Sequence, residues 1–429
     1  MSKRYSKSEA LQTRAEQTIP LGAQTFSKSK TQLPFGVSPY FATRARGSRL
    51  WDVDGNEYID FINGLCAVTL GYSDPDVTEA VRCQLESGVI FSLPHELEIQ
   101  VAERIVDMVP CAKKVRFGKN GSDATAGAVR VARAFTGRDR IAVCGYHGWQ
   151  DWYIGATTRN LGVPEATRAL THSFPYDNLG ALETLLASHR NEFAAVMLEP
   201  MNIREPGDGY LHGVIEMAHR HGALAIFDET ITGFRLAAGG AQEYFGAIPD
   251  LATFGKGLAN GYPLSAVAGR ADVMRLMEEV FFSFTMGGEA LSLAAAQAAL
   301  DKIHREPVID RLHKMGKLLM EGLKQCIEAH GSGDFAEVSG HPSWSFLSFH
   351  DAPGASQIEI KTLFLQEMFA RGILTLGTHN MSYAHDETDV KATLAVYDEV
   401  FPVLSRAVAE GAVRQYLDCE PLTPLFKIR

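Results

Sequence analysis

The 429-residue sequence predicts an α/β fold, in which a mostly parallel central sheet is covered by helices and a smaller α+β unit follows toward the C-terminus. Three observations lead to this prediction. Short apolar runs recur, and each ends in glycine or a polar residue. Stretches of helical periodicity separate these runs. A further segment with a strand-like pattern, SWSFLSFH, follows HGSGDF, a passage that contains glycine and serine. A chain of this length also exceeds what one hydrophobic core organises, so two packed units are expected.

The apolar runs have the length of buried strands, and segments with helical periodicity lie between them, which favours parallel pairing. They are Val115–Phe117, Ile141–Cys144, Ala194–Leu198, Ala223–Phe227 and Leu264–Ala268. Open parallel sheets bind ligands at the carboxyl ends of their strands. The polar residues that follow these runs are therefore expected to meet at one edge of the sheet.

Helical periodicity is visible in three places. After Gly121, apolar residues recur at spacings of four, three and four, which places them on one helix face. A second amphipathic stretch runs from about Val308 to Gln325. A third runs from Val390 to Leu404 after the acidic start at Asp386, and Pro402 is expected to kink or end it.

Charge and composition exclude several classes of protein. The net charge of −10 argues against a nucleic-acid partner, because such binding relies on clustered Lys and Arg. No apolar stretch is long enough to span a bilayer, and the N-terminal text lacks the pattern of a signal peptide, so a cytoplasmic protein without a membrane partner is expected. The six cysteines are widely spread without a C-x-x-C pair, which predicts free thiols and no metal site.

Lys256 stands between Gly255 and Gly257 at the end of an apolar segment, DLATF. A nucleotide P-loop would require Ser or Thr after this lysine, and the glycines of a serine-hydrolase nucleophile elbow are missing around Ser122. What remains is an amine nucleophile, with flanking glycines that let a flat group approach the backbone. An aldehyde cofactor such as pyridoxal phosphate suits this lysine.

The sequence offers a candidate for each further part of a pyridoxal-phosphate site. Asp228 ends the run ALAIFD and can pair with the protonated ring nitrogen of the cofactor. Gly121 and Ser122 open a helix after a strand, where backbone N–H groups and a hydroxyl favour a phosphate. Tyr146, in GYHGW, supplies an aromatic ring to stack on the cofactor.

Each of these residues also has an ordinary interpretation. The aspartate is equally a turn or cap residue, the Gly-Ser pair an N-cap, and the tyrosine a packing residue. Their coincidence at successive strand ends favours the functional interpretation. His147 and Glu199 are further candidates at the same edge, either adjusting the cofactor or making structural hydrogen bonds.

Six segments carry a family resemblance: LWDVDGNEYIDF (50–61), VRFGKNGSDATAGAVRVARAFTGRDRI (115–141), GYHGW (145–149), FDETITGFR (227–235), PDLATFGKGLANGYPLSAVAG (249–269) and FTMGGEALSLAA (284–295). In this order they resemble class III pyridoxal-phosphate aminotransferases, closest to the glutamate-1-semialdehyde 2,1-aminomutase branch. The resemblance implies a fold-type-I homodimer with shared active sites. It also implies that Lys256 is the Schiff-base lysine, and that Thr285 reaches the phosphate bound by the partner subunit.

The sequence also indicates a division of the chain, at the change of character near Leu50 and after the amphipathic stretch that ends near Gln325, and a set of substrate contacts. Residues 1–49 would contribute to the small domain and the active-site entrance, 50–315 would form the large cofactor-binding domain, and 316–429 the small C-terminal domain. Lys28, Trp149, Arg235 and His379 are tentative substrate contacts. Lys28 stands where the aminomutases have a carboxylate-binding arginine, and GTHNM (377–381) stands where they have a substrate-facing acid.

The expected activity is therefore amino-group transfer between an amino donor and an aldehyde or keto acceptor, through the Lys256 Schiff base and pyridoxamine phosphate. The alternative is intramolecular transfer, as in the aminomutases, which the two departures weaken. A non-catalytic protein that binds the same cofactor is a third possibility, and the presence of Lys256, Asp228 and Ser122 argues against it.

Overall fold

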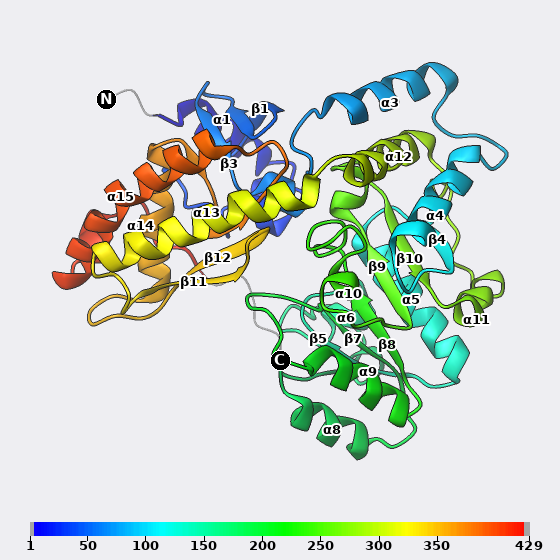
Figure 1. The fold of residues 1–429 in the computed structure, drawn as a ribbon. Helices are drawn as coiled ribbons and strands as arrows, with labels where there is room; N and C mark the ends of the chain where they lie inside the picture. The colour runs from blue at the N-terminus through cyan, green and yellow to red at the C-terminus, as the bar shows by residue number, and fades with distance from the viewer. Residues whose placement is uncertain (1–3, 424–429) are drawn as a thin grey trace. The chain divides into compact units, whose positions relative to one another are not determined.

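The computed structural model describes residues 4–423, which form two compact units (Figure 1). Within these residues, one unit comprises 4–65, 70–74 and 310–423, and the other comprises 66–69 and 75–309. The N-terminal segment thus shares its unit with the C-terminal residues. Among the described residues, no helix is long and apolar enough to cross a membrane.

The larger unit is built on a seven-stranded sheet of order β4-β10-β9-β8-β7-β5-β6. Its strands are β4 (Lys114–Gly118), β5 (Arg140–Cys144), β6 (Thr171–Ser173), β7 (Phe193–Leu198), β8 (Leu224–Asp228), β9 (Leu251–Phe254) and β10 (Ser265–Gly269). The neighbours from β6 to β9 pair in parallel, and β10 pairs antiparallel with both β9 and β4. The predicted fold class, a mostly parallel sheet in an α/β unit, is confirmed.

One strand direction was wrongly predicted, and two strands were not predicted. Leu264–Ala268 was expected to pair in parallel, yet β10 is antiparallel to both neighbours. The link from Phe254 to Ser265 holds only a short 3-10 turn, η3 (Lys256–Ala259), whereas a parallel crossover needs a dozen or more residues. The two strands of this sheet that the sequence did not predict are β6 and β9, which are only three and four residues long and therefore show little pattern.

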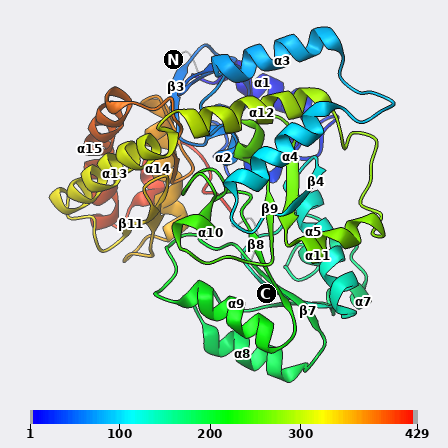
Figure 2. The same ribbon diagram turned by 45° about the vertical axis from the view of Figure 1, so that its right-hand side comes forward.

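Helices cover both faces of this sheet. They are α3 (Pro75–Ser87), α4 (Glu96–Met108), α5 (Gly121–Thr136), α6 (Asp151–Ile154), α7 (Glu165–Arg168), α8 (Leu179–Ser188), α9 (Tyr210–Arg220), α10 (Ala241–Tyr244), α11 (Ala271–Met274), α12 (Ala290–Arg305) and the 3-10 helix η4 (Arg275–Glu278). Val143, Met197 and Ile226 share one core with α5, while Ala142 and Val196 share the other with α8 and α9. This alternation follows from the period of two in a strand. Figure 2 shows α8 and α9 together on one side and α3, α4 and α12 together on another.

The helix α5 begins and ends where local chemistry dictates. Asn120 caps its first turn by accepting from the backbone N–H of Asp123, whose carboxylate accepts in return from the N–H of Asn120. Gly137 ends the helix in the left-handed conformation that glycine adopts without strain. The cap places the first residues of α5 directly after β4, at the edge where the parallel strands end.

The other unit holds two small sheets and long helices. Its sheets are β1-β2-β3-β13 and β11-β12-β14, with β1 (Ala42–Arg46), β2 (Arg49–Asp52), β3 (Glu57–Asp60), β11 (Ala336–His341), β12 (Trp344–Phe349), β13 (Ile373–Leu374) and β14 (Thr378–Asn380). Its helices are α1 (Ser6–Ala15), α14 (Gln357–Ala370) and α15 (Glu387–Ala409), with most of α13 (Val308–Ala329) and the short η1 (Pro20–Gly22), η2 (Phe26–Lys28) and η5 (Val413–Tyr416). The short helix α2 (Asn63–Cys66) lies where the chain leaves this unit.

The last long helix was predicted to kink or end at Pro402, and the second of these alternatives is wrong. Asp386 caps it as expected, by accepting from the backbone N–H groups of Thr388 and Asp389. The helix does not end at Pro402 but continues to Ala409. Phe401 and Leu404, on either side of the proline, are fully buried, and this packing holds the helix together across the missing N–H.

Candidate cofactor site

Hydrogen bonds in the larger unit join residues from four chain segments at the carboxyl edge of its sheet. His147 follows β5 and contacts Asp228, the last residue of β8, with 2.8 Å between Nδ1 and Oδ2. The backbone N–H of Tyr146 donates to Oε2 of Glu199, which follows β7 (2.9 Å). The backbone N–H of Trp149 donates to Oγ of Ser122 in the first turn of α5 (3.2 Å).

Asp228 is a buried carboxylate held from both sides. On one side, Oδ2 faces Nδ1 of His147, whose Nε2 lies 3.1 Å from the carbonyl of Cys144. On the other side, Oδ1 accepts from the backbone N–H of Thr230 (3.1 Å) and the hydroxyl of Thr253 (3.2 Å). Both imidazole nitrogens therefore face oxygen atoms, which fixes the orientation of the ring.

The electrostatics favour that ionised form. Burial alone would raise the pKa of Asp228, but the hydrogen bonds from His147 and Thr230 outweigh it and hold the pKa below its usual value. The ionised carboxylate accordingly accepts the hydrogen bond from Nδ1 of His147. Asp228 is thus a fixed negative charge, which can stabilise a protonated ring nitrogen beside it.

Glu199 lies beside this carboxylate and behaves in the opposite way. Burial, together with the negative charge of Asp228, raises the pKa of Glu199 to about 7, although the charges of His147 and Lys256 work against the shift. Its Oε2 also accepts from Nδ2 of Asn202 (2.6 Å). Two neighbouring carboxyl groups thus differ in their readiness to ionise, and Glu199 changes its protonation near neutral pH.

The first turn of α5 forms a cradle of the kind that binds a phosphate. Ser122 is buried, and its Oγ accepts from the N–H of Trp149, which leaves the hydroxyl proton for another acceptor. A Cβ on Gly148 would lie 2.2 Å from this Oγ, so the turn 145–149 fits only with glycine there. The N-terminus of this 16-residue helix adds backbone donors and a favourable dipole.

Lys256 occupies a backbone conformation that a non-glycine residue seldom adopts. Its φ is 45°, in the left-handed region, which costs roughly 1–2 kcal/mol. The predicted reason for the flanking glycines needs correction at Gly257, because a Cβ there would lie 2.4 Å from Oγ1 of Thr69. Gly257 makes room for a side chain of the same unit. The lysine charge lowers the pKa of Glu199, so its ammonium group lies within electrostatic reach of the cluster.

Tyr146 presents its ring at the same edge. The residue is half exposed, and its ring meets that of Tyr153 edge-on with 5.6 Å between the centroids. Burial of part of the ring and the negative charge of Asp228 raise the pKa of its hydroxyl. An exposed aromatic face next to Asp228 suits a flat heterocycle.

The donor set fits pyridoxal phosphate. It combines a lysine amine, a buried carboxylate for the ring nitrogen, an exposed aromatic face and a helix N-terminus with a serine hydroxyl for the phosphate. The close approach of the turn before Lys256 to α5 supports this fit, because a Cβ on Gly255 would lie 3.8 Å from the backbone of Gly121. The roles of the single residues remain predictions.

The tentative substrate residues lie in different surroundings. Trp149 is 67% exposed, next to the α5 turn. Arg235 is fully buried in the larger unit and donates to Oγ1 of Thr69 (3.2 Å). Lys28 ends η2 in the other unit, where its charge lowers the pKa of Asp60 against the stronger effect of burial. Thr285 lies in an exposed loop between η4 and α12.

His379 does not suit the role predicted for it. It is fully buried in β14 of the smaller unit, and its two ring nitrogens bond to the hydroxyls of Ser345 (3.0 Å) and Tyr397 (2.6 Å). Burial lowers its pKa to about 3, so the ring is neutral. Both nitrogens are engaged inside the unit, and we do not carry this residue into the proposal.

One contributor to the site was missed in the sequence. Thr253 pairs with Asp228 across β9 and β8, and its buried hydroxyl donates to the carboxylate. The available signal was its position: a polar residue inside the short apolar run LATF, three residues before Lys256. A polar side chain buried in a central strand requires a partner, and here the partner is the site aspartate.

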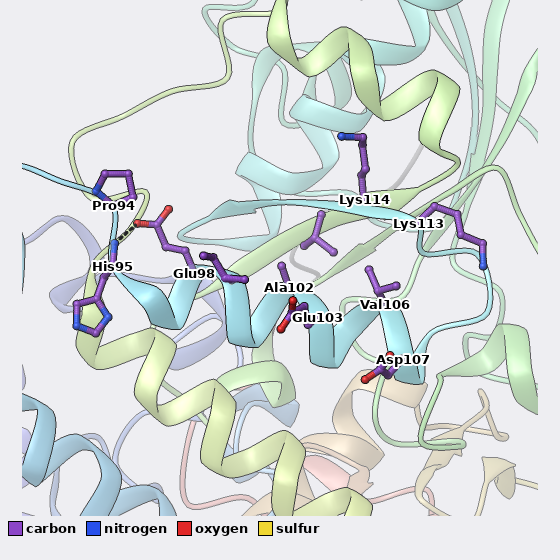
Figure 3. Close-up of a pocket in the computed structure, with 11 residues that line it drawn as sticks. Pro94, His95, Glu98, Ala102, Glu103, Val106, Asp107, Lys113 and Lys114 are labelled. Carbon is purple, nitrogen blue, oxygen red and sulfur yellow. Dashed lines mark hydrogen bonds between the residues drawn. The ribbon is translucent and has the colours of Figure 1, made fainter.

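A cavity of about 530 Å³ lies elsewhere on the larger unit, and none of the site residues lines it. Figure 3 shows Glu98, Ala102 and Val106 along α4, with Lys113 and Lys114 at the start of β4. Since β4 is the edge strand of the sheet, this cavity belongs to its open side. It has neither an amine–carboxylate pair at strand ends nor a helix N-terminus with a free hydroxyl, and we do not assign the cofactor to it.

The fold and the site define a pyridoxal-phosphate enzyme of fold type I. The model of the family "Aminotransferase class-III" matches residues 33–384, and the chain belongs to this family of enzymes, whose cofactor is pyridoxal 5'-phosphate.

Three comparisons place the chain within the family. It is 38% identical to a glutamate-1-semialdehyde 2,1-aminomutase of Sorangium cellulosum, over 92% of this chain and 96% of the relative. It is 30% identical to a 3-aminobutyryl-CoA aminotransferase of Cloacimonas acidaminovorans, over 92% and 97%. Among solved structures, the PLP internal aldimine form of the FumI protein of Sphingopyxis sp. MTA144 matches with a TM-score of 0.87 at 29% identity, over 97% of this chain and 99% of the other.

Proposed function

We propose that the protein transfers an amino group from one small molecule to the aldehyde or keto group of another. The observation that carries this proposal is the arrangement at the carboxyl edge of the sheet. Asp228 is a buried carboxylate with a lowered pKa, and Glu199 beside it lies within electrostatic reach of Lys256. His147 links Asp228 to the turn whose Trp149 bonds to Ser122 of the phosphate cradle. When bound, pyridoxal phosphate supplies an aldehyde that accepts the amino group and a ring that takes up electrons.

Each residue of the site has a separate role in this reaction. Lys256 would hold the aldehyde of the bound cofactor, and its amine, once freed by an amino donor, would carry the proton to and from the substrate carbon. Asp228 keeps the ring nitrogen protonated, and His147 and Thr253 keep Asp228 ionised and oriented. Gly121 and Ser122 hold the phosphate. Tyr146 covers one face of the ring and excludes water from it.

Transfer between two molecules is favoured by two sequence positions. At Lys28 the chain has a point charge rather than the two-pronged guanidinium that grips a carboxylate in the aminomutases it resembles. Residues 377–381 contain no acid, and within them the side chains of His379 and Met381 are fully buried. A substrate that must be retained while its own amino group moves needs a firm grip, which these positions do not offer.

A half-reaction assay tests the proposal. The purified protein, loaded with pyridoxal phosphate, is mixed with a panel of amino donors without an acceptor, while absorbance follows conversion of the cofactor to pyridoxamine phosphate. At least one donor should convert it, and the Lys256→Ala protein should convert it at least about a thousandfold more slowly. Lys302→Ala, at a buried lysine of the same unit, is the control. Equal rates for the Lys256→Ala and wild-type proteins would contradict the proposal.

Intramolecular transfer is the second candidate, and the 38% identity to an aminomutase favours it. The two reactions differ in stoichiometry, since an aminomutase needs no separate donor. Glutamate 1-semialdehyde is incubated with the loaded protein alone, and the product is measured. We expect little conversion without an added donor, whereas fast, complete conversion would replace our proposal with the aminomutase reaction.

We also propose that two copies of the chain assemble into a homodimer. Large apolar side chains are exposed near the open edge of the sheet and on the loop before α12, among them Leu93 (78%), Ile99 (62%) and Phe281 (82%). The cavity in Figure 3 lies along the same helix as Ile99. Apolar surface of this kind is costly to leave in water, and a second copy would cover it.

A further inference from the structure

The smaller unit contains a cluster of three metal-binding side chains that the reaction does not use. Cys326 lies in the last turn of α13, His330 follows the end of that helix, and Asp398 lies in α15. All three belong to the same compact unit. The sequence predicted no metal site, because the search for cysteine pairs overlooks a site whose third ligand comes from a distant helix.

The backbone sets two of these side chains on one face. The N–H of His330 donates to the carbonyl of Cys326 (3.1 Å), so the helical turn continues through His330. Residues four apart on a helix lie one above the other, so both side chains face the same neighbour. That neighbour is α15, which approaches closely: a Cβ on Gly322 of α13 would lie 2.5 Å from a methyl group of Leu394.

The third ligand reaches this face from α15. Asp398 Oδ1 lies 2.7 Å from Nε2 of His330. One ligand atom from each of Cys326, His330 and Asp398 lies within 4.8 Å of the other two. Ligand atoms around one tetrahedral ion, at bond lengths of about 2.0–2.3 Å, are separated by a little over 3 Å. Small rotations of the side chains therefore close the cluster around an ion.

We propose that Cys326, His330 and Asp398 bind a divalent transition-metal ion, with Zn²⁺ as the best match, and that the ion joins the end of α13 to α15. A sulfur, a nitrogen and an oxygen ligand together select Zn²⁺ and its neighbours in the transition series over Mg²⁺ and Ca²⁺, which take oxygen ligands. The side chain of Asp398 is 71% exposed, so an ion enters from solvent and a water molecule completes its fourth position.

Binding exchanges protons and hydrogen bonds for metal bonds. Burial and, to a lesser degree, the charge of Asp398 raise the pKa of Cys326 to about 11, so without metal the thiol keeps its proton. On binding, that proton passes to solvent and the sulfur bonds to the ion. The proton on Nε2 of His330 moves through solvent to Nδ1 of the same ring, so that Nε2 and the carboxylate of Asp398 exchange their mutual hydrogen bond for bonds to the ion. No oxidation or reduction is involved.

The ordinary interpretation is a His330–Asp398 ion pair that happens to lie near a buried thiol. The contact between His330 and Asp398 would form with any small side chain at position 326, because it requires no hydrogen bond to the sulfur. A metal site, in contrast, depends on all three side chains. Substitution at position 326 therefore distinguishes the two interpretations directly.

The experiment measures Zn²⁺ and Co²⁺ binding to the full-length protein loaded with pyridoxal phosphate. The protein is stripped with a chelator and reloaded with cofactor. It is then dialysed against buffered Zn²⁺ for metal analysis and titrated with Co²⁺ while the visible absorbance is recorded. Cys326→Ser and Asp398→Asn remove one ligand each. Cys83→Ser, at an exposed thiol on α3, and Glu328→Gln, at an exposed acid on α13, are the matched controls.

We expect one Zn²⁺ per wild-type chain and the intense visible bands of tetrahedral Co²⁺. Each ligand variant should bind at least about tenfold more weakly, since even the groups that support metal ligands contribute that much. The controls should bind as the wild type does. Asp398 is exposed, so Asp398→Asn should fold normally even if Cys326→Ser does not. The proposal is wrong if the wild type binds no Zn²⁺, or if Asp398→Asn binds it as tightly as the control variants do.

Discussion

Asp228 and Glu199 show how two neighbouring buried carboxyl groups acquire different charge states from their partners. Asp228 receives hydrogen bonds from His147, Thr253 and the backbone of Thr230, and its pKa is lowered. Glu199 receives its hydrogen bonds from Tyr146 and Asn202. These do not offset its burial and the nearby charge of Asp228, and its pKa rises to about 7. The partners, rather than burial alone, decide which of the two is ionised.

The shifted pKa of Glu199 predicts a pH-dependent stability. The folded protein holds this proton up to about pH 7, whereas an unfolded glutamate releases it near its ordinary pKa of 4.5. Stability should therefore be fully present below pH 4.5 and fall as the pH rises to 7, by about 1.4 kcal/mol per unit and roughly 3 kcal/mol in all. The Glu199→Gln protein should lack this decline.

The measurement is urea denaturation of the cofactor-free proteins at pH 5 and pH 8. Glu216→Gln, at an exposed position on α9, is the matched control and should follow the wild type. Between pH 5 and pH 8, the free energy of unfolding of the wild type should fall relative to that of the Glu199→Gln protein. A difference that stays constant across this range would show that Glu199 titrates normally.

At the scale of the elements, the sequence predicts what depends on local pattern and misses what depends on pairing. The apolar runs and the spacing after Gly121 predict five strands and α5 close to their observed bounds. The direction of β10 follows from the length of its connection, and β6 is too short to show a pattern. Thr253 became part of the site only through its register with Asp228. Pairing between distant segments cannot be read from either segment alone.

The α5 cradle gives a prediction for two glycines with similar backbone conformations. Gly148 has φ 102°, and a Cβ there would strike Oγ of Ser122; Gly137 has φ 66° and open space around its Cβ position. Alanine strains the backbone at both positions by roughly 1 kcal/mol. Gly148→Ala should in addition displace Ser122, and pyridoxal phosphate should bind about ten- to a hundredfold more weakly.

Equilibrium titration with pyridoxal phosphate, beside thermal unfolding, separates the two effects. Both variants should unfold at lower temperature than the wild type, while Gly137→Ala should keep the cofactor affinity of the wild type. If Gly148→Ala also binds the cofactor normally, Ser122 is not part of the phosphate cradle.

At the scale of the whole molecule, the larger unit alone supplies the cofactor contacts that we propose, while Lys28, a substrate contact predicted from the sequence, belongs to the smaller unit. The substrate could not be predicted from the sequence, because the family resemblance concerns the cofactor chemistry and the sequence departs from the aminomutase pattern at Lys28 and 377–381. The exposed loop that carries Thr285 has no assigned role within one chain. Its proposed role appears only when a second copy is considered.

Subunit complementation tests that role. Lys256→Ala chains and Thr285→Glu chains should each be inactive, the second because an acidic side chain repels the phosphate. After subunit exchange, hybrid dimers should regain up to half of the wild-type activity per dimer, because one of their two sites combines an intact Lys256 with an intact Thr285. Exchange is confirmed by native mass spectrometry. Proven exchange without recovered activity would mean that Thr285 does not serve the neighbouring site.

The most direct test of the account concerns the attachment of the cofactor. The protein is incubated with pyridoxal phosphate and treated with borohydride, which makes a reversible bond between an aldehyde and an amine permanent, and its peptides are then analysed by mass spectrometry. We predict a single modified peptide that carries the cofactor on Lys256, and no stable attachment in the Lys256→Ala protein. A cofactor fixed to another lysine, or none fixed to a fully loaded wild-type protein, would contradict the central claim that Lys256 is the amine that holds pyridoxal phosphate.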